Sequence, residues 1–247
     1  MGNKLYFITD AHLGSGQDSI QRERELCALL DHIKKDAQAI FFLGDMFDFW
    51  FSYKYVVPRG FIRLLGKMAE LADDGIELHY FTGNHDMWLF DYLPQQMHIQ
   101  MHDEPAIMRL DNKTFLIGHG DGVGKTDKKF NILKSIFRNR VNQFLFSMLP
   151  SRMTFKFARS WSDHNKTKHN YPQYLGDDKE DIVIYCNQQI QHNSIDYCVF
   201  GHRHNAIIKP ISDTTTYINV GDWLHNRDYA VYSNGAFHLE SYSAQQQ

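Results

Sequence analysis

The sequence is poor in cysteine and has no long apolar run. Its three cysteines, Cys27, Cys186 and Cys198, lie far apart and form no CxxC pair. This pattern excludes a disulfide framework and a zinc knuckle. No run approaches the about 20 apolar residues of a membrane-spanning helix. The opening MGNKLYFITD lacks the apolar segment of a secretory signal. We therefore expect a cytoplasmic protein without a transmembrane segment.

The sequence also has no large excess of one charge sign. It contains 26 Lys and Arg and 29 Asp and Glu, which gives a net charge of −3. Net charge therefore points to no particular partner. With 247 residues, 43% of them apolar, the chain is long enough for one substantial domain. A domain of this size buries roughly 70% or more of its unfolded surface. We expect residues 1–247 to form a single domain that carries an insertion.

Strand-like and helix-like segments alternate along the first third of the chain. Short apolar runs predict strands, and apolar residues at helical spacing predict helices between them. This β-α-β-α-β order predicts an α/β sandwich with parallel strands. In the helix expected at 19–35, Ile20 is placed on the apolar face together with Leu26, Leu29, Leu30 and Ile33. The expected elements are a strand at 4–9, a helix at 19–35, a strand at 39–44, a helix at 60–75, a strand at 77–82, strands at 106–110 and 114–118, a helix at 179–192, and strands at 196–200, 216–220, 229–233 and 236–242.

The segment 125–170 differs from the rest of the chain. It combines many Lys and Arg with many Phe and has very few acidic residues. Its apolar spacing is helical, and Pro150 is expected to separate two helices. We predict that this segment is a helical insertion between two strands of the main sheet, and we call it the cap.

Polar side chains follow five of the predicted strands directly. In open α/β sheets, binding sites form at the carboxyl ends of strands, so these loops are expected to converge. Alternate residues at a strand end point the same way, which would direct Asp10 with His12, and His202 with His204, into one pocket. The residues in question are Asp10 and His12, then Asp45, then Asn84, His85 and Asp86, then His119, and finally His202 and His204.

This mixture of nitrogen and oxygen ligands suits first-row divalent metals such as Mn, Fe, Co and Zn. A carboxylate can bridge two ions, and Asp45 is the candidate. Two ions about 3.5–4 Å apart activate water and stabilise the entering and leaving oxygens of phosphoryl chemistry. Two divalent ions outweigh the two carboxylates of Asp10 and Asp45, so the site would keep positive charge for an anionic phosphate.

The motifs DAH, GD, GNHD, GH and GHRH, in this order and each at a strand end, resemble the calcineurin-like metallophosphoesterases. The resemblance implies a four-layer αββα sandwich and a site with two divalent metal ions. Mn²⁺ is the expected ion, and Fe, Co and Zn are alternatives. One metal would be held by Asp10, His12, Asp45 and His204. The other would be held by Asp45, Asn84, His119 and His202.

The resemblance also implies catalytic roles for His85 and Asp86. His85 would face the phosphate as a cation or as a proton donor to the leaving group, and Asp86 would hold its ring. Asp121 and Asp222 are either acids that support the ligands or turn formers.

Two further stretches resemble one branch of this family, the UDP-2,3-diacylglucosamine hydrolases of lipid A synthesis. They are GDMFDFW at 44–50 and HGDGVGKTD at 119–127, which ends on Asp127. Asp48 and Trp50 of the first stretch have an ordinary reading too, as a helix cap and a core aromatic. That branch cleaves the pyrophosphate of a UDP-linked diacylated glucosamine and releases UMP. The chain differs from the best-known enzymes of the branch at His85, where they have Arg, and at Phe130, where they often have Tyr.

The composition of the cap suits such a substrate. Lys125, Arg159 and other basic residues are expected to meet phosphates and an anionic membrane surface. Phe130, Phe137 and Phe144 are expected to line an acyl groove. The protein would then associate peripherally with the cytoplasmic face of the inner membrane. The alternative for the cap is a solvated basic face over its own small core.

Three other functions stay open. The first is a phosphoesterase for another nucleotide-linked or lipid phosphoester, which an acyl-chain requirement would separate from our interpretation. The second is a nuclease, because basic residues interleaved with aromatics bind single strands; the apolar character of the cap argues against it, and no stable nucleic-acid partner is expected. The third is a non-catalytic scaffold, which would have no need of a complete ligand set.

Overall fold

The computed structural model describes residues 2–124, 128–156 and 174–243. Strands and helices alternate in its first half, as the apolar periodicity predicts. The strands are β1 (Lys4–Ile8), β2 (Ala37–Phe42), β3 (Glu77–Phe81), β4 (Gln100–His102), β5 (Ala106–Leu110), β6 (Lys113–Gly118), β7 (Tyr197–Phe200), β8 (Ile207–Pro210), β9 (Thr216–Asn219), β10 (Asp228–Ser233) and β11 (Ala236–Ser241). The helices are α1 (Ser19–Ile33), α2 (Ile62–Asp73), α3 (Tyr92–Met97), α4 (Lys128–Arg138), α5 (Arg140–Ser147) and α7 (Asp181–Gln189).

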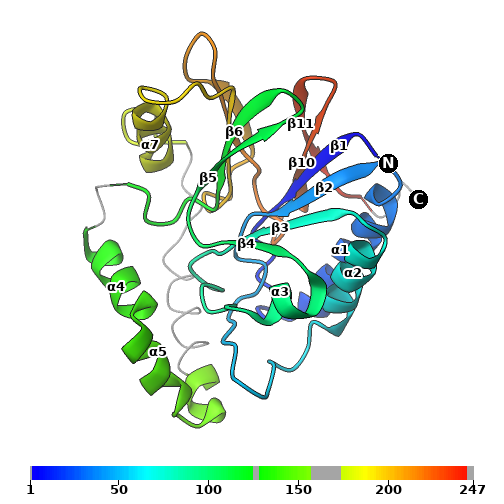
Figure 1. Cartoon of the computed structure of the whole chain (residues 1–247), viewed down its shortest axis with the longest axis vertical. Coiled ribbons are helices and arrows are strands. Elements are labelled where there is room, and N and C mark those ends of the chain that lie inside the picture. Colours follow the sequence, from blue (N-terminus) through cyan, green and yellow to red (C-terminus); the bar gives the residue numbers. More distant parts are fainter. Residues whose placement is uncertain (1, 125–127, 157–173, 244–247) are drawn as a thin grey trace.

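The strands form two sheets, which Figure 1 shows packed against each other. The first has six strands in the order β11-β10-β1-β2-β3-β4, and the second has five in the order β5-β6-β7-β9-β8. Strands β1 to β4 run parallel, as do β6, β7 and β9. In the first sheet, β10 runs antiparallel to β1 and pairs antiparallel with the edge strand β11; in the second sheet, the antiparallel strands β5 and β8 lie at the edges. The carboxyl ends of the parallel strands therefore gather at one side of each sheet.

Alternation along the central strands explains the layers. In β1, Leu5 and Phe7 enter the apolar cluster between the two sheets, whereas Tyr6 and Ile8 enter the cluster under the helices α1 and α2. Successive side chains of a strand point to opposite faces, so a strand buried on both faces reads as a continuous apolar run. The first sheet is thus covered by helices on one side and by the second sheet on the other.

The second sheet repeats this arrangement. Phe115 and Ile117 of β6 face the first sheet, and Leu116 faces a third cluster that includes Ile182 and Val183 of α7. Helix α7 covers the outer face of this sheet (Figure 1). The order helix, sheet, sheet, helix confirms the predicted four-layer αββα sandwich.

The expected elements are confirmed within a few residues at each end, with three omissions. Strand β4 has three residues and β8 four, and α3 has six, so none is long enough to show a periodic pattern. The placement of Ile20 was wrong, because its side chain is 59% exposed at the first turn of α1. The apolar face of α1 begins further along, with the buried Leu26, Leu29 and Leu30.

The described part of the cap is helical and lies between β6 and β7 in the chain. Helix α5 begins with Asn139, whose side chain accepts hydrogen bonds from the amides of Val141 and Asn142. It ends at Ser147, and a further helical stretch runs from 151 to 156, so Pro150 does separate two helices. The single-domain interpretation and the limits of the cap stay predictions.

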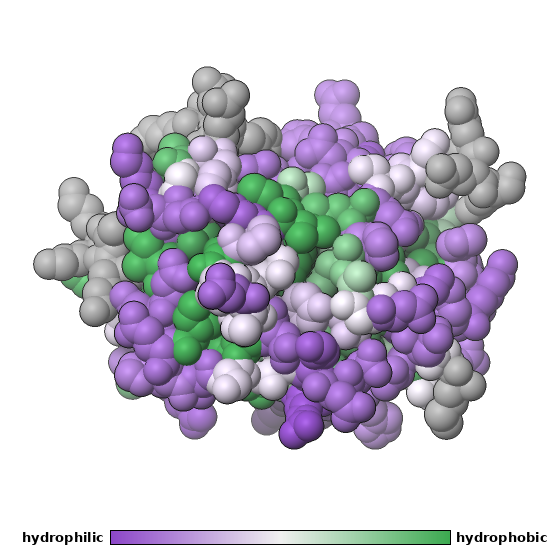
Figure 2. All heavy atoms as spheres, turned by 90° about the horizontal axis from the view of Figure 1, so that it is seen from above, coloured by the Kyte–Doolittle hydropathy of each residue, from purple (hydrophilic) through white to green (hydrophobic). Residues whose placement is uncertain are grey.

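Apolar side chains also reach the surface. Seen from above, the molecule has a central apolar band with polar side chains around it (Figure 2). Such surface is common, since more than half of a folded protein's accessible area is apolar. Within the described ranges, no helix combines the length and the apolar character that a bilayer crossing requires.

Candidate metal centre at the carboxyl ends of the strands

The loops that follow β1, β2, β3, β6 and β7 bring the predicted polar residues together. Asp10, His12 and Asp45 have positive φ angles of 52°, 43° and 52°, and His202 and His204 have 66° and 49°. Non-glycine residues adopt this left-handed region at a cost, and such strain clusters at functional sites. The alternation argument for paired side chains was therefore wrong: these residues lie beyond the strands, and left-handed turns make them converge.

Asp10 divides its two carboxylate oxygens between two tasks. Oδ2 accepts hydrogen bonds from the Thr9 hydroxyl (2.6 Å) and the His202 amide (2.9 Å). Oδ1 lies 3.2 Å from Nε2 of His204 and 3.6 Å from Nε2 of His12. This buried oxygen has no hydrogen-bond partner among the described residues. One oxygen fixes the side chain, and the other is presented to the imidazoles.

Asp45 divides its oxygens in the same way. Its Oδ1 accepts a hydrogen bond from the amide of His85 (2.8 Å). Its Oδ2 lies 3.3 Å from Nε2 of His119 and 3.8 Å from Nε2 of His12. Gly83 makes this arrangement possible, because a Cβ there would lie 2.2 Å from Oδ1 of Asp45. Asp45 thus stands between the imidazoles of two different loops, as a bridging ligand must.

Two further predicted ligands are His119, which follows β6 of the second sheet, and Asn84, which follows β3 of the first sheet. His119 donates from Nδ1 to the carbonyl oxygen of Leu43 (2.6 Å), which leaves Nε2 directed at Asp45. A hydrogen bond from the far nitrogen is the usual way to fix the tautomer of a metal-binding histidine. The amide oxygen of Asn84 is buried and has no hydrogen-bond partner in the part of the chain that the structure describes.

The site fits metal ions on its donor chemistry. Three overlapping groups of side chains place one ligand atom each within 4.8 Å of the others. Two ligand atoms about 2.0–2.2 Å from one ion lie about 3–3.5 Å apart at tetrahedral or octahedral angles, close to the nitrogen–oxygen distances above. Buried acceptors without hydrogens facing them are what a cation requires. The groups are Asp10, His12 and His204; His12, Asp45 and His85; and Asp45, His119 and His202.

The electrostatics of the cluster favour positive charge at its centre. Burial alone would raise the pKa of Asp10, yet His204 and His12 hold it well below its usual range. Burial alone would lower the pKa values of His12 and His119, but the neighbouring carboxylates raise them to about 9 and about 10. Burial and the nearby His119 lower the pKa of His202 to about 4. Bound cations would supply the same positive charge in place of protons.

The expected contact between Asp86 and the ring of His85 was wrong. The His85 ring donates from Nδ1 to the backbone carbonyl of Asp48 (2.9 Å). The carboxylate of Asp86 instead accepts hydrogen bonds from the amides of Met46 (2.9 Å) and Gly83 (2.8 Å) and from the Tyr80 hydroxyl (2.5 Å). Its side chain points into the loops and ties the one after β2 to the one after β3. Burial, followed by repulsion from Asp45, raises the pKa of Asp86 to about 6.

Asp48 is the site residue whose position sequence reasoning missed. Its Oδ1 lies 3.5 Å from Nδ1 of His12 and 3.8 Å from Nδ1 of His85, so one carboxylate contacts both rings. The stretch GDMFDFW carried the signal, but the helix-cap reading was wrong, since no helix begins there. Trp50 is a fully buried core aromatic, as expected.

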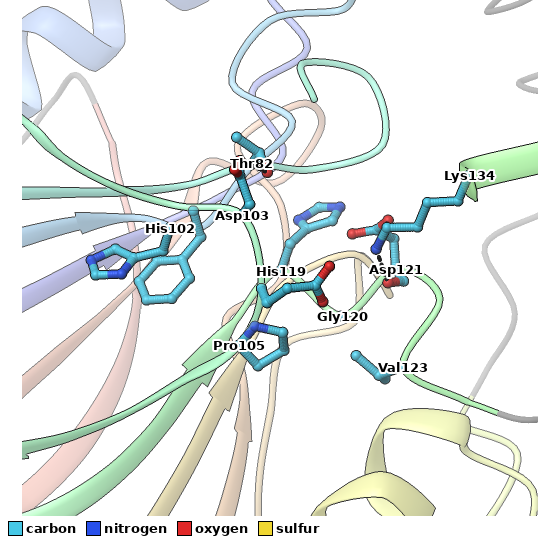
Figure 3. A pocket seen from close by; sticks show the side chains of 11 residues that line it. Thr82, His102, Asp103, Pro105, His119, Gly120, Asp121, Val123 and Lys134 are labelled. Carbon is cyan, nitrogen blue, oxygen red and sulfur yellow. Dashed lines mark hydrogen bonds and ion pairs between the residues drawn. The ribbon is translucent and has the colours of Figure 1, made fainter. Parts of the chain in front are cut away.

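The two aspartates with open roles are now placed. Asp222 does both things: Oδ2 lies 3.9 Å from Nδ1 of His204, and Oδ1 accepts a hydrogen bond from the amide of His225. Asp121 lies beside His119 in a small pocket, where Lys134 of α4 reaches its carboxylate (2.8 Å) and its carbonyl (2.9 Å) (Figure 3). The cap therefore contacts the edge of the metal centre directly.

The predicted substrate residues are only partly described. Phe137 packs its ring on Trp88 with the ring centroids 5.4 Å apart, which anchors the cap to the core. Phe144 is 64% exposed. Lys125, Asp127 and Arg159 lie outside the described residues, as does the side chain of Phe130.

Comparison with known proteins agrees with this geometry. A family model described as calcineurin-like phosphoesterase matches residues 4–206. The chain belongs to this family. The match spans all five loops of the metal centre, confirms the resemblance seen in the motifs, and identifies the protein as a phosphoesterase, a hydrolase of a family whose members use divalent metal ions.

Individual proteins of known sequence or structure are also similar to this chain. The phosphoesterase is 38% identical to a UDP-2,3-diacylglucosamine hydrolase from Porphyromonas gingivalis, over 98% of this chain and 98% of that protein. It is 26% identical to the protein of the same name from Haemophilus ducreyi, over 90% and 92% of the two chains. Among solved structures, a phosphoesterase from E. coli has a TM-score of 0.48 at 14% identity and covers 96% of this chain and 92% of its own.

Proposed function

We propose that this phosphoesterase cleaves the pyrophosphate bond of UDP-2,3-diacylglucosamine and releases UMP and 2,3-diacylglucosamine 1-phosphate. The observation that carries the proposal is the 38% identity to a hydrolase named for this substrate, which extends over 98% of both chains and so includes the cap. The two stretches GDMFDFW and HGDGVGKTD support the same branch.

The donor atoms described above support the assignment of metal ligands that the family resemblance implies. We infer that two divalent ions bind, with Mn²⁺ as the expected metal and Fe, Co or Zn as alternatives. Asp45, whose Oδ2 lies near Nε2 of both His12 and His119, would belong to the ligand sets of both ions. When bound, such ions supply an activated water and neutralise phosphoryl charge. The first ion would be held by Asp10, His12, Asp45 and His204. The second would be held by Asp45, Asn84, His119 and His202.

His85 is proposed as the group that meets the substrate phosphate. Its Nδ1 donates to the carbonyl of Asp48, so Nε2 is the nitrogen that gains or loses a proton. The ring lies 4.7 Å from that of His12, at the edge of the ligand cluster. From there it can donate a hydrogen bond to a phosphoryl oxygen or a proton to the departing group. Asp86 acts indirectly. Its carboxylate holds together the loops that carry Asp45 and His85.

The cap is proposed to bind the acylated part of the substrate. Its described helices are anchored through Phe137 and Phe146, which pack on Trp88 at centroid distances of 5.4 and 4.8 Å. Other apolar side chains are exposed, among them Phe144 of α5 at 64% and Met148, directly after this helix, at 69%. Acyl chains offer a partner for such side chains. Lys125, Asp127, Arg159 and Phe130 stay proposed substrate residues on the sequence resemblance.

The same surface supports peripheral association with a membrane. Residues 139–156 contain Arg140, Arg152 and Lys156 and no acidic residue. Exposed apolar groups alone are ordinary, as Figure 2 illustrates for another face. Their combination with cations in a stretch that has no acidic residue suits an anionic bilayer. We propose that the enzyme works at the cytoplasmic face of the inner membrane, where a diacylated substrate resides.

The test compares two substrates. Protein loaded with Mn²⁺ is given UDP-2,3-diacylglucosamine or unacylated UDP-N-acetylglucosamine, and release of UMP is followed, with His119→Ala as the inactive control. We expect turnover of the acylated substrate only. Hydrolysis of a simple aryl phosphodiester without turnover of either sugar nucleotide would keep the metal centre and reject the substrate.

A further inference from the structure

Arg22 is a buried cation that the chemistry above does not use. It is only 1% exposed and is among the largest fully buried side chains. Its donors reach backbone carbonyls of the loop after β1: Nε donates to Ala11 (3.1 Å), and Nη2 donates to His12 (3.1 Å) and Ser15 (2.5 Å). Nη1 donates to the carboxylate of Asp18 (2.5 Å). One guanidinium therefore donates hydrogen bonds to three carbonyl oxygens of the loop.

This loop holds its metal-facing side chains in an unfavourable conformation. His12 has a φ of 43°, which a non-glycine residue keeps only when its surroundings enforce it. The amide side of the loop is held by the loop after β2, since His12 donates to the carbonyl of Asp45 (2.9 Å) and Leu13 donates to that of Met46 (2.9 Å). The carbonyl side is held by Arg22. The two sets of bonds together fix the direction in which His12 points.

We propose that Arg22 is a positioning residue for His12, and through it for the metal ion that His12 and Asp10 would hold. The inference rests on the proposed metal centre. A guanidinium suits the task because its planar set of donors can meet several carbonyl oxygens at once. Its charge partner, Asp18, has a side chain that is 56% exposed, so the ion pair itself contributes little to stability.

The neighbouring residue supplies a matched control. Glu23 is also buried on α1, and its Oε1 accepts hydrogen bonds from the amides of Arg63 (2.9 Å) and Leu64 (3.2 Å) in the first turn of α2. Those amides have no intrahelical acceptor. The variant Glu23→Ala thus removes buried hydrogen bonds that the same helix makes with α2, whereas those of Arg22 go to the loop after β1.

The experiment titrates metal-free protein with Mn²⁺ by calorimetry and follows thermal unfolding in parallel. We expect wild type and Glu23→Ala to bind two ions with equal affinities, and Arg22→Met to bind one of the two at least about tenfold more weakly, as loss of a residue that orients a ligand does. Excess Mn²⁺ should restore the activity of Arg22→Met with an unchanged KM. Arg22→Lys, which keeps the charge but loses the planar fork, should fall between the two.

Each result bears on one conclusion. Two ions bound by Arg22→Met with wild-type affinities would overturn the role of Arg22 and leave the metal centre intact. If Arg22→Met does not fold, Arg22→Lys decides: wild-type affinity for both ions overturns the proposal, and selective weakening of one supports it. Wild-type protein that binds no Mn²⁺ would reject the proposed function itself. If Glu23→Ala weakened Mn²⁺ binding as much as Arg22→Met does, Arg22 would contribute only to the general stability of the protein and would not position His12.

Discussion

The metal centre and the cap present their side chains in opposite ways. At the metal centre, Asp10 and Asp45 are 0% and 2% exposed, and each of their oxygens has a defined neighbour. On the cap, Val141 and Phe144 are each 64% exposed, in a stretch with no acidic residue to balance its cations. The donor atoms of the metal centre are thus held by the fold itself, whereas the proposed recognition of acyl chains rests on side chains that the described residues leave exposed.

Within the described residues, the cap contacts the edge of the metal centre and the core beside it. Trp88 donates from its indole nitrogen to the carbonyl of Phe137 (2.9 Å) and packs on the ring of Phe146. Lys134 reaches Asp121 beside His119. The comparison therefore predicts that variants of the metal centre stop every reaction, and that variants of the cap and its contacts affect some substrates more than others.

The largest effect is expected for Asp45→Asn. The substitution keeps the shape of the side chain but removes the charge that would be shared by two cations. Since metal ions contribute several kcal/mol to phosphoryl transfer, we expect hydrolysis to fall by about 10³-fold or more. Rates are measured with the acylated sugar nucleotide and with an aryl phosphodiester. If Asp45→Asn hydrolysed one of these two substrates at the wild-type rate and not the other, the metal centre would not be common to both reactions.

A smaller loss is expected for Asp48→Asn. Asp48 contacts the rings of both His12 and His85, so its charge should help to hold both rings in their orientations. Loss of such a carboxylate commonly costs about 10–100-fold in metal affinity or activity. We expect kcat to fall on both substrates while KM stays within about twofold of wild type. Asp36→Asn is the control, because Asp36 pairs with Lys4 and Tyr6 at the opposite end of β2.

The variant Lys134→Met tests the contact between the cap and the edge of the metal centre. Loss of its two bonds to Asp121 should loosen the cap without removing a metal ligand. We expect KM for the acylated substrate to rise by about tenfold, which corresponds to about 1.4 kcal/mol, and the rate on an aryl phosphodiester to stay unchanged. An equal loss on both substrates would mean that Lys134 serves the metal centre rather than the cap.

The smallest effect is expected for Glu23→Ala, which lies in neither region. The variant leaves two amides of α2 without their acceptor. Loss of a helix cap costs about 1 kcal/mol, which should lower the melting temperature by about 2–4 °C in a chain of this size. Steady-state rates on both substrates should match wild type at 25 °C. A change in either rate would show that the helical layer influences the metal centre more widely than its contacts suggest.

Local patterns predicted the strand ends well because their chemistry is local. An apolar run that stops at Asp10, Asp45, Asn84, His119 or His202 marks both the end of a strand and a cluster of donors. The rule that such ends converge then followed from the parallel order of the strands. The mechanism of convergence was misjudged, because left-handed turns, not strand alternation, direct these side chains. Asp and His adopt such backbone angles more often than most non-glycine residues, but residue type alone does not tell which Asp or His in a chain does so.

The partners of the ligands could not be predicted in the same way. Asp48 lies 36 residues after His12 in the chain, yet their side chains are 3.5 Å apart. The ring of His85 finds the carbonyl of Asp48 rather than the adjacent carboxylate of Asp86, because Asp86 is turned toward the amides of Met46 and Gly83. Neighbours in sequence are poor guides to orientation once a loop turns sharply.

The sequence by itself determined the alternation of strands and helices and the strand ends at which polar side chains gather, since both depend on periodicity and on residue type; the four layers were implied by the resemblance of its motifs to a known family. Only the tertiary structure decided which oxygen of Asp10 and of Asp45 is presented, which buried cation braces the loop after β1, and which face of the cap is left exposed. These features depend on directions and distances between segments far apart in the chain, and such directions are fixed only when the segments pack.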